Sequence, residues 1–192
     1  EVQEIIEKSE GLYYDEINTL NKLAQTMRTK RFQAGAIDFQ QAQVHFRLDD
    51  TGKPLSVYFS ESNESHQLIE EFMLLANRTV AEKIGRKAPN APNAPLKTFV
   101  YRIHDQPNPE KISMLSKFVS KLGYKMKSAS GRTTSASAHN SLLKEVHGSK
   151  EQNVIEQISL RTMQKARYST ENIGHYGLAF RYYTHFTSPI RR

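Results

Sequence analysis

Tyr-Thr-His-Phe-Thr-Ser-Pro-Ile-Arg-Arg, residues 183–192, is the stretch around which this chain is organised. Ser188 followed by Pro189 is typical of a helix start, where free backbone N–H groups and the helix dipole attract anions. Arg191 would add a planar fork of donors that suits a phosphate. Tyr183 is near enough in sequence to pack against this corner or to stack on a base. The residues alone allow two interpretations: a phosphate-binding corner, or a helix cap followed by two solvated arginines.

Length, charge and composition narrow the class of protein. The 192 residues suit one domain, and the net charge of +7 favours a polyanionic partner, most simply nucleic acid. The absence of cysteine excludes disulfides, thiolate metal sites and a cysteine nucleophile, and it fits a cytosolic protein. No apolar run reaches about 18 residues, so no membrane span is predicted, and no signal peptide is recognisable. We therefore expect a cytoplasmic protein that binds nucleic acid and no membrane.

Hydrophobic spacing predicts an α+β fold, in which an antiparallel hairpin or sheet is packed by long helices. Apolar residues recur at helical spacing through residues 1–32, with one break, and again through 66–84. Between these stretches, residues 44–48 and 55–59 alternate in polarity on either side of turn-forming residues 49–53. This pattern predicts the hairpin.

The second half of the chain is predicted to form shorter elements. Alternation indicates a strand over residues 99–104, and Asn108-Pro109 begins a helix that ends at Gly123. One interpretation of residues 174–180 is a turn followed by a strand at 178–180. Ser149 and Gln152 have the spacing of a capping box and predict another helix start.

Composition also predicts loops and close backbone approaches. Residues 86–95 are rich in proline, alanine and asparagine, residues 125–141 are rich in serine, lysine, threonine and glycine, and both are predicted to be exposed loops. Gly85 is interpreted as the cap that ends the helix over 66–84. Gly174 and Gly177 indicate a backbone that passes close to other atoms, and the His175 between them is given no catalytic role.

Four segments resemble, in order, motifs of the RNB family, the processive 3′→5′ exoribonucleases related to ribonuclease II and ribonuclease R. They are RFQAGAIDF at 31–39, LIEEFMLLAN at 68–77, GHYGLA at 174–179 and HFTSPIRR at 185–192. The resemblance spans nearly the whole chain and is greater to ribonuclease R. An unrelated basic binding module would have to produce all four motifs by coincidence.

The resemblance implies roles for individual residues. Arg191 would hold the scissile or adjacent phosphate and offset transition-state charge, with Arg192 as a second phosphate contact. Glu70 matches a glutamate that contacts the ribose of bound RNA, although a carboxylate on a helix flank is also commonly just solvated. Phe39 matches an aromatic that stacks on a base near the 3′ end, although its residue type equally suits the core. Tyr183 is the remaining candidate RNA contact.

The resemblance also implies hydrolysis of RNA to nucleoside 5′-monophosphates with Mg²⁺ held by a cluster of aspartates. In the family that cluster precedes these motifs, and this chain has no Asp-rich run; Asp49-Asp50, in the hairpin turn, is a poor substitute. Residues 1–192 are therefore predicted to be the C-terminal half of an RNB catalytic domain, without the Mg²⁺ ligands, the N-terminal half or the flanking OB-type RNA-binding domains. The expected partner is the 3′ end of single-stranded RNA. The alternative is a catalytically inactive RNB-like protein that only binds RNA.

Overall fold

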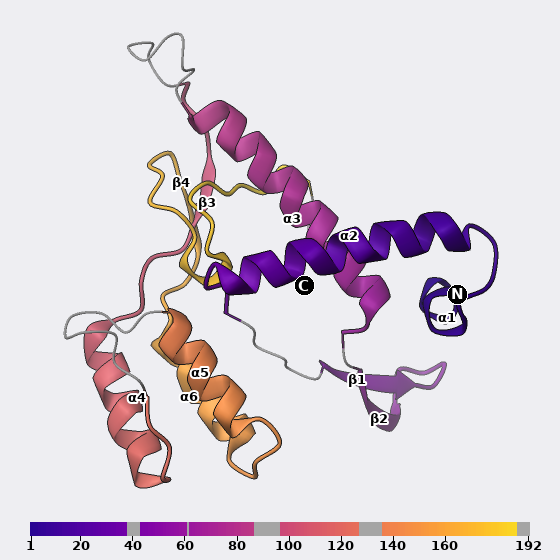
Figure 1. Ribbon diagram of the computed structural model, residues 1–192. Coiled ribbons are helices and arrows are strands. Elements are labelled where there is room, and N and C mark those ends of the chain that lie inside the picture. Colours follow the sequence, from indigo (N-terminus) through magenta and orange to yellow (C-terminus); the bar gives the residue numbers. More distant parts are fainter. Residues whose placement is uncertain (38–42, 61, 87–96, 127–135, 188–192) are drawn as a thin grey trace. The chain divides into compact units, whose positions relative to one another are not determined.

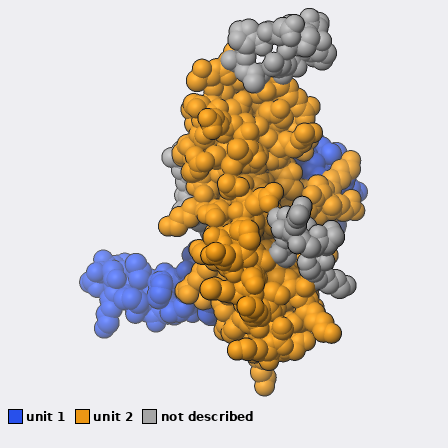
Figure 2. All heavy atoms as spheres, turned by 90° about the vertical axis from the view of Figure 1, so that its left-hand side faces the viewer, with its two compact units in different colours: residues 1–27, 39–72 blue, residues 28–38, 73–192 orange. Residues whose placement is uncertain are grey.

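The structure is a computed structural model, shown as a ribbon in Figure 1. It describes residues 1–37, 43–60, 62–86, 97–126 and 136–187. Helices and two antiparallel sheets of two strands each make up the described part, which confirms the α+β prediction. The chain divides into two compact units, residues 1–27 with 39–72 and residues 28–38 with 73–192, coloured separately in Figure 2.

The first unit confirms the predicted helices and hairpin. It contains α1 (Val2–Lys8), the strands β1 (Gln43–Leu48) and β2 (Pro54–Ser60), and the first parts of two long helices, α2 (Tyr14–Gln33) and α3 (Glu64–Gly85). The break between α1 and α2 falls at Gly11, whose φ of 125° is a conformation that glycine adopts without a steric penalty.

Side-chain hydrogen bonds fix the local geometry of this unit. The Asn21 amide donates to the Glu64 carboxylate (2.7 Å), which joins α2 to the start of α3. In the hairpin turn, one Asp49 carboxylate oxygen accepts from the backbone N–H groups of Thr51 and Lys53, both at 2.9 Å. Hydrogen bonds, above all from the Thr51 side chain, lower the pKa of Asp49. Asp49 is thus occupied as a turn former.

The second unit carries both buried hydrophobic clusters that the described residues form. Its elements are the second parts of α2 and α3, then β3 (Tyr101–Ile103), α4 (Pro109–Lys121), α5 (Ala136–Val146), α6 (Gln152–Thr162), β4 (Arg167–Ser169) and the 3₁₀ helix η1 (Tyr176–Leu178). One cluster joins α4, α5 and α6 through Leu115, Val119, Leu142, Val146 and Ile155. The other joins α3 to β3 through Ala81, Tyr101 and Ile103.

Helix α4 is confirmed, and the loop predicted over 125–141 is partly wrong. The Asn108 side chain caps α4 by accepting from the N–H groups of Glu110 (2.8 Å) and Lys111 (3.3 Å). Residues 127–135 lie outside the described residues, but α5 begins at Ala136. Ala138 and Leu142 are buried on one face of α5, so packing overrides a composition typical of a loop. Of the loop predicted over 86–95, only Arg86 is described.

Two further details of the second unit differ from prediction. Helix α6 is present, but Gln152 accepts a hydrogen bond from the N–H of Gly148 (2.7 Å), so the predicted capping box with Ser149 is wrong. The predicted strand over 178–180 is instead η1 followed by a turn, with a single bridge between His175 and Phe180. The strand that pairs with β3 is β4, which local alternation did not reveal.

The close approach of two tyrosine side chains requires glycine at position 85. The interpretation of Gly85 as a helix cap did not include this requirement. It is the buried last residue of α3, and a Cβ there would lie 2.6 Å from the Tyr101 hydroxyl and 2.8 Å from the Tyr182 ring. Real Cβ atoms are not found so close to other atoms. Glycine therefore lets α3 pack directly on β3 and on the segment that leads to the HFTSPIRR motif.

We expect Gly85→Ala to lower the free energy of unfolding by about 1 kcal/mol or more, as overpacked cores do. Alanine is intrinsically the better helix former by about 1 kcal/mol, so a loss can only come from the clash with the tyrosine rings. Urea unfolding measures it, with Lys83→Ala, at an exposed position of the same helix, as control. Equal stability of Gly85→Ala and the parent would show that the rings move aside freely.

Candidate functional site

The segment over residues 172–187 lies beside β3 and leads into the HFTSPIRR motif. The N–H of Arg102 donates to the carbonyl of Tyr183 (2.9 Å), and the N–H of His104 donates to the carbonyl of Gly174 (3.0 Å). These two bonds hold both ends of the segment against the same short strand. The motif that follows is therefore attached to the second unit through backbone bonds and not only through side chains.

Two glycines allow this segment to pass close to its neighbours. Gly174 has a φ of 85°, and a Cβ there would lie 3.0 Å from the carbonyl oxygen of Phe180. A Cβ on Gly177 would lie 3.0 Å from Nδ1 of His104. The close backbone approach expected for the GHYGLA motif is thus present, and its neighbours are other residues of the same unit.

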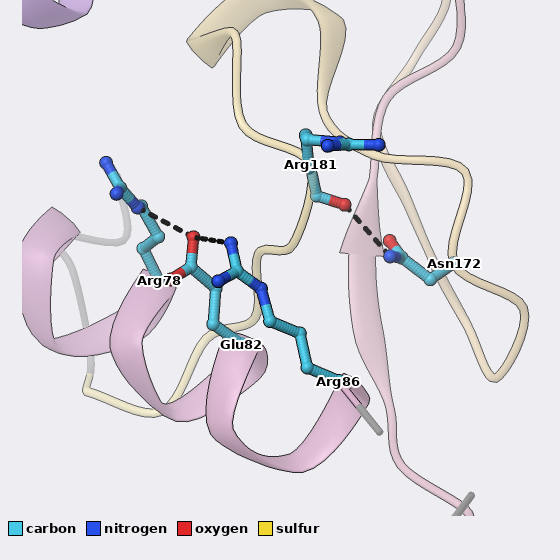
Figure 3. Close-up of polar contacts among 5 residues, drawn as sticks. All are labelled: Arg78, Glu82, Arg86, Asn172 and Arg181. Atoms are coloured by element: carbon cyan, nitrogen blue, oxygen red, sulfur yellow. Dashed lines mark hydrogen bonds and ion pairs between the residues drawn. The ribbon is translucent and has the colours of Figure 1, made fainter. Parts of the chain in front are cut away.

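The Asn172 side chain stabilises the turn that contains these glycines. Its amide nitrogen donates to the carbonyl of Arg181 (2.9 Å), as drawn in Figure 3, and its amide oxygen accepts from the N–H of Gly174 (3.0 Å). One side chain thereby satisfies backbone groups at both ends of the turn.

Asn77 joins two of the four motifs. It is the last residue of LIEEFMLLAN, and its side chain is fully buried in α3. Its amide oxygen accepts two hydrogen bonds from Thr187 of the HFTSPIRR motif, from the backbone N–H at 2.7 Å and from the hydroxyl at 3.0 Å. An amide oxygen has two acceptor sites, so Thr187 occupies both. The chain is thus fixed four residues before Arg191.

Cationic side chains of α3 cover the aromatic rings of the same segment. The Arg78 guanidinium lies 5.5 Å from the centroid of the Phe180 ring, and that of Arg86 lies 5.6 Å from the Tyr182 ring. Figure 3 shows Glu82 between the two arginines, paired with Arg78 at 3.0 Å and with Arg86 at 3.4 Å. The carboxylate holds both guanidinium groups near the helix, where they can contact the rings.

Histidine and tyrosine rings of this segment form a cluster with His104, the residue that follows β3. Ring centroids are 4.9 Å apart for His104 and His175, 5.3 Å for His175 and Tyr183, and 5.7 Å for Tyr183 and His185. The His185 ring in turn contacts the Tyr168 hydroxyl through Nδ1 at 2.8 Å. The edge-to-face geometry of these pairs is one that aromatic rings prefer.

Hydrogen bonds and burial keep the two inner histidines neutral. His104 accepts the N–H of Gly177 at Nδ1 (3.1 Å), which leaves Nε2–H to donate to the carbonyl of Gln164 (2.8 Å). His175 accepts the N–H of Leu178 at Nδ1 (3.2 Å). Burial, with His104 and Arg102 nearby, lowers the pKa of His175 to about 3. Both rings are therefore neutral near pH 7, and the absence of a catalytic role for His175 stays a prediction.

The structure describes only some of the predicted site residues. Phe39, Arg191 and Arg192 lie outside the described residues. Glu70 is exposed on α3, while the neighbouring Glu71 is 3% exposed. Glu70 belongs to the first unit, and Tyr183, the other described candidate, belongs to the second.

Tyr183 is a predicted RNA contact that the structure describes, in the second unit. Its side chain is 4% exposed, and its ring contacts His175, Phe180 and His185. Such burial favours a packing role for Tyr183 within the ring cluster over the expected stacking on a base. The physical reason is that the cluster already covers the ring.

Sequence reasoning gave no role to Asn77 or to the two arginines of α3. The motif that contains Asn77 was recognised, but only its carboxylates were considered. A buried asparagine on an apolar helix face is the signal that was available, because an amide there needs partners. The stacking of Arg78 and Arg86 could not be anticipated, because their aromatic partners are about 100 residues away in sequence.

The described residues do not by themselves form a metal centre. Within the described ranges, no three or more His, Asp or Glu side chains are grouped so that they could hold a metal ion. The donors present do not fit an Mg²⁺ site, which requires clustered oxygen ligands. No helix in the described part of the chain combines the length and the apolar character needed to span a membrane.

Comparison with known proteins gives consistent matches along the whole chain. The family model described as RNB domain matches residues 1–192. Ribonuclease R of Aquifex aeolicus is 33% identical over 97% of this chain and 25% of its own length. Ribonuclease R of Vibrio cholerae is 32% identical over 100% of the chain and 23% of its own length. The chain thus spans about a quarter of the curated relatives it matches.

Solved structures match over the same extent. Mycoplasma genitalium RNase R in complex with ribose-methylated single-stranded RNA superposes with a TM-score of 0.82 at 26% identity, covering 100% of this chain and 29% of that one. The same enzyme in complex with double-stranded RNA also gives 0.82, covering 33% of that chain. Yeast Ssd1, described as a pseudonuclease, shares the fold with a TM-score of 0.63 at 20% identity over 100% of this chain and 23% of its own.

We expect Thr187→Val, which removes the hydroxyl while keeping the side-chain shape, to lower the free energy of unfolding by about 0.5–1.5 kcal/mol. The reason is that one acceptor site of the buried Asn77 amide then loses its partner. Thr187→Ser keeps the hydroxyl and serves as control. Urea unfolding compares the two variants; equal losses would mean that the hydroxyl bond does not stabilise the fold.

The buried neutral state of His175 predicts acid sensitivity. Its pKa is about 3 in the folded chain and near 6.5 when unfolded, so below pH 6.5 only the unfolded chain binds this proton. The free energy of unfolding should therefore fall as the pH drops from about 6.5 towards 3, and His104, whose pKa burial also lowers, acts in the same direction.

Urea unfolding from pH 7.5 to 4.5 should show a shallower fall for His175→Asn than for the parent. His147→Asn, at an exposed position, should keep the parent slope; identical slopes for both variants would refute the assignment.

Proposed function

The chain belongs to the RNB domain family, and from this membership we propose that it is part of a processive 3′→5′ exoribonuclease that hydrolyses RNA to nucleoside 5′-monophosphates. The observation that carries the proposal is the pair of hydrogen bonds by which Asn77 holds Thr187. These bonds connect two separate motifs of the family, so the motifs act as parts of one site. The proposed location of the protein is the cytoplasm.

The proposed roles follow from the chemistry of each side chain. Arg191 holds the scissile or adjacent phosphate, because a guanidinium offers paired donors and stays charged at any working pH. Arg192 is a second phosphate contact. Glu70 accepts a hydrogen bond from a ribose 2′-hydroxyl, a group that DNA lacks. Phe39 stacks on a base near the 3′ end, which suits an enzyme indifferent to sequence, because every base has a flat face.

Support for a nucleic-acid partner comes from the charge of the chain and from its relatives. The net charge of +7 favours a polyanion. The matching Mycoplasma genitalium enzyme has been solved with single-stranded and with double-stranded RNA. We propose the 3′ end of single-stranded RNA as the partner of this chain.

We propose that the Mg²⁺ of this reaction is held by residues that are not among the 192 residues of this chain. The donors in the described part do not fit such a site, and Asp49 is occupied in its turn. No step of the reaction is assigned to a metal ligand in this chain. The half of the RNB domain that precedes these motifs, together with OB-type RNA-binding domains, would supply the remaining machinery.

A catalytically inactive RNA-binding relative is the alternative. The fold match to yeast Ssd1, a pseudonuclease, is the observation that favours it, because it indicates that this fold alone does not guarantee catalysis. The residues of this chain suit either protein. The metal-binding carboxylates of the longer protein distinguish the two.

Arg191→Ala in the longer protein tests the proposed catalytic role. We expect turnover of 5′-labelled single-stranded RNA to fall about 100-fold or more, as removal of a transition-state donor does, with a smaller loss in RNA binding. Single-turnover kinetics and a binding titration measure the two effects. Lys53→Ala, in the exposed hairpin turn, serves as control. Unchanged turnover would refute the role of Arg191.

The 192-residue chain itself provides a separate test. Incubated with the same RNA and Mg²⁺, it should bind RNA without shortening it, because the metal ligands are proposed to lie elsewhere. A parallel reaction with EDTA identifies any metal-dependent cleavage. Release of mononucleotides that EDTA abolishes would contradict the proposed division of the site.

A further inference from the structure

The hairpin of β1 and β2 has one face made entirely of apolar side chains. Opposite residues of an antiparallel pair lie on the same face, and here Val44 is opposite Phe59 and Phe46 is opposite Val57. Toward the turn the register shifts between Arg47 and Leu48, so that Leu48 is opposite Pro54, next to Leu55, and these two leucines extend the apolar row. These six residues, which we call the apolar hairpin face, are between 50% and 70% exposed.

The other face of the same hairpin is polar. The His45 ring stacks on Tyr58 at 5.3 Å between centroids, and Arg47 is opposite Ser56. An antiparallel sheet with one apolar and one polar face is the pattern of a sheet that lies on a hydrophobic core and turns its other side to water. The sequence of the hairpin is therefore that of a covered sheet.

The buried cores of the described residues do not include this face. Both hydrophobic clusters are formed by residues of the second unit, from Ala81 onward. An isolated two-stranded hairpin is marginally stable in water and requires a packing partner. Six adjoining exposed apolar side chains exceed what the surface of a finished domain usually presents.

We infer that the apolar hairpin face is an interaction surface for the longer RNB polypeptide, and that an apolar surface from outside these 192 residues covers it. The chain matches its relatives along its whole length but spans 25% of the Aquifex aeolicus protein and 29% of the Mycoplasma genitalium chain. Most of each relative is thus available to supply the cover. The inference rests on family membership and not on the proposed catalytic activity.

The chemistry of the face argues against RNA as its occupant. Val44, Leu48, Leu55 and Val57 are aliphatic, and an aliphatic side chain offers neither a cation for phosphate nor a flat ring for a base. The apolar hairpin face itself contains no lysine or arginine. A protein surface of similar apolar character is its natural complement.

The experiment compares two neighbouring cross-strand pairs. Phe46→Thr with Val57→Thr removes the centre of the apolar hairpin face, and His45→Thr with Tyr58→Thr makes the same change on the opposite face. Threonine favours strands, so both double variants keep the backbone preference. In the longer polypeptide, we expect the first variant to lower Tm by roughly 5 °C or more relative to the second, as measured by calorimetry. An equal or smaller loss than that of the control pair would overturn the inference.

Hydroxyl-radical footprinting of Phe46 and Phe59 identifies the occupant. We expect both rings to be labelled in the 192-residue chain and protected in the longer polypeptide without RNA. Protection in the 192-residue chain at all concentrations would mean that the chain covers its own face. Protection that grows with concentration, together with a dimer in sedimentation, would identify a second copy; protection of the longer polypeptide only after addition of single-stranded RNA would identify RNA. Each of these three results overturns the inference. Because RNA hydrolysis is not measured, failure here leaves the proposed function to its own tests.

Discussion

The hydrogen bonds from Thr187 to the buried amide of Asn77 are the constraint on which the candidate site depends. The Asn77 oxygen is fully buried, so it cannot exchange its two partners for water without a large desolvation penalty. Thr187 uses both its backbone and its hydroxyl, which fixes the position of the chain and also its orientation. A motif that must present an arginine to a phosphate benefits from such an attachment, because small misplacements greatly reduce catalysis.

Helix α3 supports the segment over 172–187 by three different kinds of contact. Asn77 supplies hydrogen bonds, Arg78 and Arg86 supply cations over aromatic rings, and Gly85 supplies the space that lets the tyrosines approach. The contacts extend from Asn77 to Arg86, about two and a half turns of helix, and they reach the part of the segment from Phe180 to Thr187. Glu70 precedes them on the same helix, in the part of α3 that belongs to the first unit.

The sequence pattern correctly predicted the elements whose formation depends on residues close together in the sequence. The hairpin and α4 have alternation, turn residues and the Asn108 cap within a few positions, and the structure has them where expected. Helix α5 was mistaken for loop because it depends on burial of Ala138 and of Leu142, which shares a buried cluster with Ile155 of α6, and not on its composition. Strand β4 and the role of Asn77 were missed for one reason: their partners are over 60 residues away. Such pairings cannot be read from spacing in a single sequence.

The histidines and the arginines of the candidate site have different roles, because they differ in whether their charge changes with pH. His104 and His175 are held neutral by burial, and each accepts a backbone N–H of the GHYGLA turn, at Gly177 and at Leu178. A histidine that gained a proton would lose this acceptor, so the turn requires the low pKa that its surroundings impose. An arginine has the opposite property, because its charge does not depend on pH within the working range. The GHYGLA turn therefore relies on neutral histidine rings, while the proposed phosphate contacts are arginines, which remain cationic.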